Sequence, residues 1–126
     1  MKILTKEDIL NHKDYHTSLD MCRNIGKNMK GYMCHEFVHI LYVLKEIMGE
    51  SCKTYLEIGT HNGGSLATVM QSKYKTDFYG VDVWWRIENM RFTTTNVDKH
   101  NKHKHKYELI RGLCLLCLST FVVVNR

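Results

Sequence analysis

The chain has 126 residues, with 18 Lys plus Arg against 13 Asp plus Glu and a formal net charge of +5. This length accommodates one domain with a modest core and is too short for two. Much of the charge lies in the run from Lys99 to Lys106. That run has no interleaved aromatic residues to stack on bases, so we expect a solvated loop or helix face, with phosphate or acidic-surface binding as the alternative; nucleic-acid binding is not indicated.

Residues 1–50 predict a helical N-terminal segment that contains two helices. The first helix covers residues 5–22, where Thr5 is a candidate N-cap and Asp8 follows it at the third position. Its apolar pattern is weak, and most of its surface is polar. Residues 23–31, which end in a glycine, predict a connecting loop.

The second helix, residues 37–48, has a strong apolar stripe and a stop at Gly49, and we expect it to pack against a sheet. The segment His35-Glu36-Phe37-Val38-His39 matches the zinc-protease pattern H-E-x-x-H. In a zinc hydrolase, His35 and His39 would hold the metal and Glu36 would act as general base. A third ligand at a recognisable spacing is missing, so exposed or capping histidines are the favoured interpretation, and stoichiometric zinc would indicate the hydrolase.

Residues 51–126 predict the core of the domain, and its first part runs from Cys52 to Trp84. A short apolar strand ends at Ile58, and residues 59–65 are small, polar or turn-forming. Apolar residues at helical spacing follow, and residues 78–83 then predict a second strand. A glycine turn between a strand and a helix lets the backbone approach a ligand closely and points free N–H groups at it.

The remaining elements complete an alternating pattern. Residues 87–101 predict a further helix, residues 107–112 a third strand, and residues 121–124 a candidate fourth strand. The fold class is therefore α/β: a partial Rossmann-like parallel sheet of three or four strands, preceded by two helices, in a single domain. Ligands bind such sheets at the carboxyl ends of the strands.

The residues at those ends indicate the chemistry of the ligand. Asp82 follows the glycine turn by about 20 residues, the separation expected of a carboxylate that binds a ribose diol. A dinucleotide fingerprint, G-x-G-x-x-G, would need a second glycine where His61 stands, and Glu57, two residues before Gly59, would repel a pyrophosphate. The pattern favours a ligand with a cationic amino group and no phosphates, and S-adenosylmethionine (SAM) has that character.

Three segments, YLEIGTHNGGSL, YGVDVW and YELIRG, resemble the class I SAM-dependent methyltransferases, in the branch whose first motif is L-E-I-G-x-x-x-G-G-S. By this resemblance, the methionine part of SAM would be lined by Glu57, Gly59 and Gly63. The loop over it would be formed by Thr60, His61 and Asn62. Asp82 would bind the ribose hydroxyls, Trp84 would pack near the adenine, and the methyl acceptor would be a small molecule or a sugar.

The resemblance covers residues 53–112 and then ends. The small polar pair that the family places after its third strand is replaced by Leu113-Cys114, and no acidic motif follows. We therefore expect a truncated or frame-shifted terminus, and we assign no catalytic residue. A non-catalytic remnant or a partner-binding module is the alternative to an active enzyme. An uncovered sheet edge favours homodimerisation, aggregation or marginal stability.

The five cysteines are scattered, and no signal peptide accompanies them, which favours a reducing, cytoplasmic compartment. Cys114 and Cys117 have C-x-x-C spacing inside an apolar run, where buried structural thiols are favoured over zinc or redox chemistry. That run, residues 113–124, falls short of the roughly 20 residues needed to span a bilayer, so no membrane segment is expected.

Overall fold

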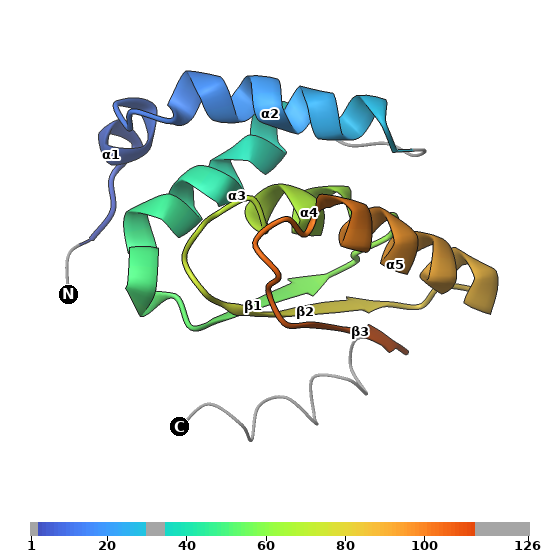
Figure 1. Cartoon of the computed structure of the whole chain (residues 1–126). Coiled ribbons are helices and arrows are strands. Elements are labelled where there is room, and N and C mark those ends of the chain that lie inside the picture. The colour runs from blue at the N-terminus through green and yellow to red at the C-terminus, as the bar shows by residue number, and fades with distance from the viewer. Residues whose placement is uncertain (1–2, 30–34, 113–126) are drawn as a thin grey trace.

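The computed structural model describes residues 3–29 and 35–112. In this part of the chain, the described helices lie on one face of a parallel β-sheet (Figure 1). The elements in chain order are α1 (Lys6–Leu10), α2 (Tyr15–Lys27), α3 (His35–Met48), the 3₁₀ turn η1 (Gly49–Ser51), β1 (Thr54–Ile58), α4 (Gly64–Val69), β2 (Asp77–Asp82), α5 (Ile87–His100) and β3 (Tyr107–Arg111).

The sheet confirms the predicted α/β class. Its strand order is β1-β2-β3, and both pairings are parallel. Helix α4 connects β1 to β2, and α5 connects β2 to β3, as parallel strands require a crossover. The carboxyl ends of all three strands therefore meet at one edge of the sheet, where the glycine turn and Asp82 lie.

The N-terminal segment corrects the prediction of two helices, because three precede β1. The capping box at Thr5 is present, with the Asp8 N–H donating to Thr5 Oγ1 at 3.2 Å. Helix α1 then ends at Leu10, and the Asp14 N–H donates to His12 Nδ1 in the turn that follows. Helix α2 does not stop at residue 22 but continues to Lys27, through the stretch predicted to be a loop.

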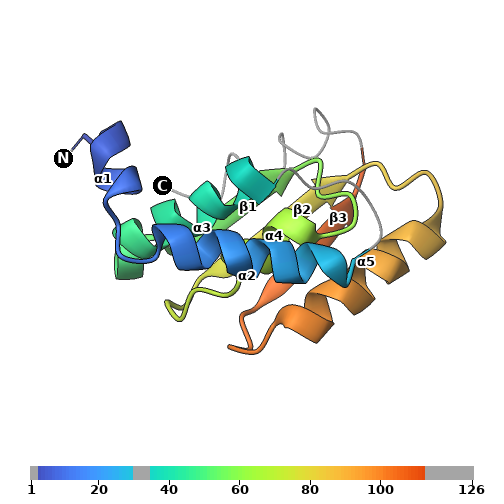
Figure 2. The same cartoon turned by 90° about the horizontal axis from the view of Figure 1, so that it is seen from above.

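The extension of α2 has a tertiary cause. Its buried face consists of Ser18, Cys22 and Ile25, and Figure 2 shows α2 lying across the helical layer of the domain. A single glycine inside a helix costs only about 1 kcal/mol, whereas burying an Ile side chain contributes about 1.5–3 kcal/mol. Burial of Ile25 therefore outweighs the cost of the neighbouring Gly26.

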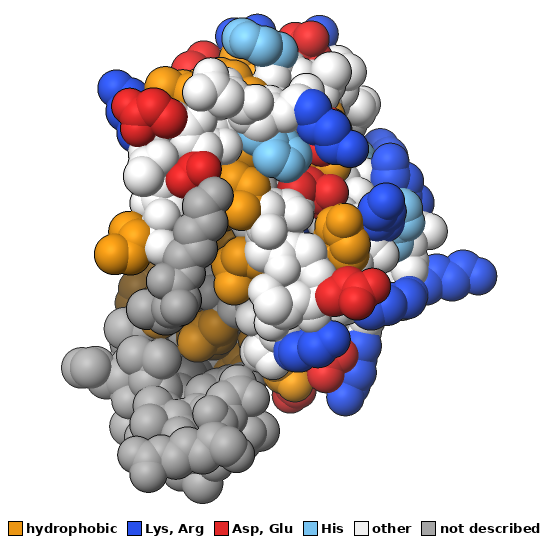
Figure 3. All heavy atoms as spheres, turned by 90° about the vertical axis from the view of Figure 1, so that its left-hand side faces the viewer, with side chains coloured by type: hydrophobic (Ala, Val, Ile, Leu, Met, Phe, Trp, Pro, Cys, Tyr) orange, Lys and Arg blue, Asp and Glu red, His pale blue; other side chains and the backbone are white. Residues whose placement is uncertain are grey.

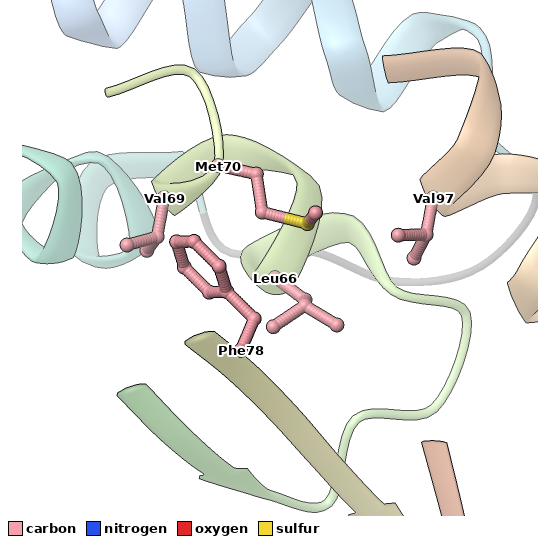
Figure 4. Close-up of a cluster of buried hydrophobic side chains, with 5 residues drawn as sticks. All are labelled: Leu66, Val69, Met70, Phe78 and Val97. Atoms are coloured by element: carbon pink, nitrogen blue, oxygen red, sulfur yellow. The ribbon is translucent and has the colours of Figure 1, made fainter. Parts of the chain in front are cut away.

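The core lies between the sheet and the two crossover helices. Five fully buried side chains form it: Leu66, Val69, Met70, Phe78 and Val97 (Figure 4). Although α4 has only 6 residues, every position from Leu66 to Val69 is buried. This short helix therefore acts as the centre of the helical layer and fixes the position of the turn that precedes it.

Strand β1 exposes apolar side chains on one of its two faces. Along β1, Tyr55 and Glu57 are partly buried, while Leu56 and Ile58 keep 38% and 51% of their surfaces exposed. Within residues 3–29 and 35–112, β1 pairs only with β2. No helix in these ranges is long and apolar enough to cross a membrane.

Gly63 is the residue on which the packing of α4 against α5 depends. It precedes α4 with φ +85°, and a Cβ atom there would lie 2.8 Å from Val97 Cγ2 and 3.1 Å from Thr93 Cγ2. Gly63→Ala therefore combines left-handed strain with overpacking, and we expect it to lower the free energy of unfolding by about 2–4 kcal/mol. Urea denaturation followed by circular dichroism measures this change, and a loss below the error of the method would contradict the packing.

Candidate functional site

A pocket of about 440 Å³ opens at the carboxyl ends of β1 and β2. Its lining comes from the turn after β1, the segment after β2 and the first half of α5: His61, Asn62, Asp82, Val83, Trp84, Trp85, Asn89 and Phe92. The turn is fastened to β2 because the N–H groups of Gly59 and Thr60 both donate to Val81 O, at 2.8 and 3.2 Å. These two hydrogen bonds continue the parallel pairing past the end of β1, and they hold the turn at the base of the pocket in place.

Asp82 joins the two loops of this pocket. Its Oδ2 accepts the His61 N–H at 2.8 Å, and its Oδ1 accepts the Trp84 N–H at 3.1 Å. Each carboxylate oxygen has two acceptor sites, so both keep capacity for a ligand hydroxyl. The predicted ribose-binding carboxylate therefore also acts as a structural link between the loops.

The glycine turn contains positions with opposite surroundings. Gly59 has φ +82°, and a Cβ atom there would find nothing within 4 Å, so space is open above it. Gly63 is enclosed by α5, as described above. Thr60 is buried and packs over Gly80, where a Cβ atom would lie 2.7 Å from Thr60 Oγ1. Gly63 and Thr60 therefore shape the turn from outside the pocket lining, while His61 and Asn62 lie within it.

Glu57 carries an unsatisfied buried oxygen close to the turn. Its Oε2 accepts the Tyr55 hydroxyl at 3.1 Å, but its Oε1 is buried without a hydrogen-bond partner. Burial raises the pKa of this carboxyl to about 7, although the nearby hydroxyls of Ser65 and Tyr55 oppose the shift. A buried acceptor without a partner is costly, and a cationic donor from a ligand would remove that cost.

Trp84 takes a structural position in the pocket wall. It has φ +29° and is 4% exposed. Its indole N–H donates to His61 O at 2.8 Å and lies 3.1 Å from Thr93 Oγ1. The aromatic side chains with free surface at the pocket are instead Trp85, which is 82% exposed, and Phe92, which is 41% exposed; the sequence analysis named neither.

Three further residues hold the pocket loops in place and were also missed. Asn96 Nδ2 donates to Asn62 O at 3.1 Å, and the Thr93 hydroxyl donates to His61 O. From β3, Arg111 donates through Nε to Trp84 O at 2.8 Å and through Nη2 to Trp85 O at 3.1 Å. The only sequence signal for the two α5 residues is that polar side chains occur beside Val97 on the inward face of a helix.

The second histidine of the H-E-x-x-H segment, His39, packs between helices α2 and α3. His39 is 1% exposed, its Nδ1 lies 2.9 Å from Ser18 Oγ, and burial lowers its pKa. The expectation of an exposed histidine is therefore wrong for His39. Arg23 forms an ion pair with Glu36 at 3.7 Å. Among the described residues, no group of three His, Cys, Asp or Glu side chains could hold a metal ion.

Two features of the sequence analysis lie outside the residues that the structure describes. These are the Cys114–Cys117 pair and the candidate fourth strand at residues 121–124. The described C-terminal end of the domain is β3 with Gly112, whose N–H donates to Asp82 O at 3.0 Å. All of the pocket residues named above belong to the described part of the chain.

Known proteins show what this arrangement resembles. No protein-family model matches the chain. An uncharacterized protein of Acanthamoeba polyphaga mimivirus is 34% identical over 82 residues, which cover 63% of this chain and 37% of that protein. An O-methyltransferase from Bacillus cereus, solved in complex with SAH, has a TM-score of 0.62 at 18% identity, covering 95% of this chain and 53% of that one.

A putative O-methyltransferase from Klebsiella pneumoniae gives a TM-score of 0.53 at 15% identity, covering 92% of this chain and 50% of that one. At such identities the likeness shows the fold alone. The chain therefore has the Rossmann-like α/β fold of these O-methyltransferases. It spans just over a third of the mimivirus protein and about half of each solved structure.

The buried carboxyl of Glu57 makes stability depend on pH in a defined direction. The folded chain keeps this group protonated between its ordinary pKa of 4.5 and the raised value of about 7, whereas the unfolded chain releases the proton. The stabilisation that the protonated carboxyl contributes is fully present below pH 4.5. As pH rises through this window, the free energy of unfolding falls by about 3 kcal/mol. Glu57→Gln cannot ionise, so we expect its stability relative to the wild type to rise across the window.

Urea denaturation of both proteins at pH values on either side of this window measures the change. The buried histidines, whose pKa values are lowered, give the opposite slope. The wild type and Glu57→Gln share these histidines, so the histidine contribution cancels when the two free energies of unfolding are subtracted. A difference that stays constant with pH would show that Glu57 is ionised at little cost.

Proposed function

We propose that this chain binds SAM in the pocket at the carboxyl ends of β1 and β2, as the cofactor-binding part of a methyltransferase that acts on a small molecule or a sugar. The observation that carries the proposal is a pocket at the carboxyl ends of β1 and β2 that is lined by the Asp82 carboxylate and by His61 and Asn62 of the glycine turn. Gly59, at the start of that turn, leaves open space for a ligand. The fold shared with O-methyltransferases supports it.

The chemistry of the pocket fits the parts of SAM. Asp82, in the pocket lining, suits the ribose diol through charge-assisted hydrogen bonds. Glu57 is not among the described lining residues; it lies two residues before Gly59, and we assign its buried Oε1 to the cationic amino group. Among the described residues that line the pocket, none is Lys or Arg. A pyrophosphate would therefore find no cation among these described residues and would meet the charge of Asp82, which disfavours a dinucleotide.

SAM, when bound, supplies a methyl group on a sulfonium, which becomes a neutral thioether after transfer to an oxygen or nitrogen nucleophile. In the proposed arrangement, the residues of this chain bind and orient the cofactor: Asp82 fixes the ribose, and the turn from Gly59 to Asn62 covers the methionine part. The exposed aromatic surfaces of Trp85 and Phe92 lie where an adenine ring or an acceptor would enter. We assign no catalytic residue.

Calorimetry with SAM and with S-adenosylhomocysteine tests the cofactor. We expect both to bind the wild-type chain and Asp82→Asn to weaken binding by more than tenfold, because the amide removes the charge that strengthens two hydroxyl contacts. Asn is preferred to Ala since its carbonyl can still accept one of the two backbone N–H groups. Asp77→Asn, an exposed position at the other end of β2, is the matched control. A folded wild-type protein that gives no heat and no thermal shift would contradict the proposal.

Gly59→Ala tests whether the open space above the turn belongs to the ligand. The added methyl group meets no protein atom within 4 Å, so the cost to stability is only the left-handed strain of about 1–2 kcal/mol. We expect SAM affinity to fall at least tenfold in a protein that still unfolds cooperatively. Unchanged affinity would place the cofactor elsewhere.

A methyl-transfer assay with a panel of small-molecule and sugar acceptors separates an active enzyme from a binding module. Turnover that disappears in Asp82→Asn supports the enzyme. Binding of SAM without turnover supports the remnant or partner-binding alternative, in which the described chain supplies only the cofactor half.

A further inference from the structure

The amino-terminal edge of the sheet, opposite the pocket, carries a row of lysines. Lys53 immediately precedes β1, Lys75 lies two residues before β2, and Lys106 immediately precedes β3; all three are exposed. Neighbouring strands are about 4.8 Å apart, so these side chains start from adjacent positions across about 10 Å. Figure 3 faces this end of the molecule and shows Lys and Arg side chains gathered along its right-hand side, with fewer acidic side chains among them.

A hollow of about 520 Å³ lies within this row. It is lined by Lys53, Lys73, Lys75, Tyr74 and Glu50, so three ammonium groups face it with one carboxylate. The Lys73 ammonium lies 5.5 Å from the centre of the Tyr74 ring. The ammonium of Lys45, which is 2% exposed, lies 5.4 Å from the same ring and donates to Tyr74 O at 3.3 Å.

The basic segment 101–106 extends the row and corrects the expectation of a freely solvated loop. Its histidines point inward: His103 Nε2 lies 3.0 Å from Gln71 O, and His105 Nε2 lies 2.7 Å from Ser72 O. Lys75 Nζ donates to His103 O at 2.7 Å. The lysines between and beside these histidines, Lys102, Lys104 and Lys106, are exposed. The segment is therefore fastened to the loop before β2 and presents its lysines outward in fixed places.

We propose, against the expectation from the sequence, that this lysine row binds the phosphodiester backbone of a nucleic acid, without regard to base sequence. Phosphates are the groups that a line of compact ammonium charges neutralises best. The one aromatic ring in the hollow, Tyr74, is already flanked by two ammonium groups, so stacking on bases contributes little. The row lies at the end of the sheet away from Asp82, so its ligand is not the cofactor.

Fluorescence anisotropy with a labelled oligouridylate tests this proposal. It also separates binding at the lysine row from attraction by the overall positive charge of the chain. The row variant replaces Lys53, Lys73 and Lys102 by Gln, and the matched control replaces Lys6, Lys13 and Lys27, exposed lysines at the N-terminal helices. Both variants lose the same three charges. Lys75 is left intact because it holds the basic segment in place. Circular dichroism melting of both variants checks that they fold.

We expect the row variant to bind at least about tenfold more weakly than the wild type, and the control less than about threefold. Because each phosphate contact contributes about 0.7 to the slope of log affinity against log salt, the slope should fall by about 2 in the row variant only. Equal losses in both variants, or no binding by the wild type at low salt, would overturn the proposal.

Two competing ligands complete the test. Tighter binding to vesicles with anionic phospholipids than to the oligonucleotide would identify a membrane-surface patch instead, and equal binding to polyglutamate would show that phosphate is not recognised. SAM affinity, measured on the row variant, should match the wild type, since the two sites lie at opposite ends of the strands. The nucleic-acid proposal is therefore independent of the SAM proposal: a chain that does not bind SAM can still bind the oligonucleotide through the lysine row.

Discussion

The hydrogen bond from the His61 N–H to the Asp82 carboxylate is the interaction on which the rest of the site depends. It connects the turn after β1 to the last residue of β2, so two segments far apart in sequence move as one. Parallel pairing brings them together, and the contacts of Gly59 and Thr60 with Val81 O continue that pairing into the turn. Without this connection the glycine turn would be an ordinary surface loop, and the pocket would have no fixed floor.

Local patterns predicted the centre of the fold because each of its elements is specified by its own residues. The strand from Thr54 to Ile58, the turn after it and the strand ending at Asp82 were all anticipated. The N-terminal segment was not, because its boundaries depend on a polar contact in a turn and on tertiary burial. A contact between His12 and the Asp14 N–H accompanies the break after α1, and burial of Ile25 carries α2 past a glycine. Neither effect is visible in the apolar period of the chain.

The residues of the candidate site fall into the same two groups: those specified by the local sequence and those brought in by the tertiary fold. Of the eight residues predicted to bind the cofactor, His61, Asn62, Asp82 and Trp84 line the pocket, and their role in binding stays a prediction. The other four, Glu57, Gly59, Thr60 and Gly63, are not among the described lining residues. The sequence could not predict the neighbours that the tertiary fold brings in: Arg111 from β3, or Thr93, Asn96 and Phe92 from α5. It also placed His39 and His105 at the surface, whereas both are buried. His105 lies in a basic run that gives no sign of burial, and His39 was assigned as a polar residue although it lies within an apolar helix. Polar residues that support other residues are therefore the part of a site that a single sequence reveals least.

The adjacent residues Trp84 and Trp85 are the only two tryptophans of the chain, and they differ sharply in surroundings. One indole is enclosed and hydrogen-bonded to the turn, while the other is 82% exposed beside the pocket. Tryptophan emission depends on the polarity around the ring. The tryptophan fluorescence of this protein therefore arises from the wall of its candidate site, with one emitter enclosed by the fold and the other exposed to solvent beside the pocket.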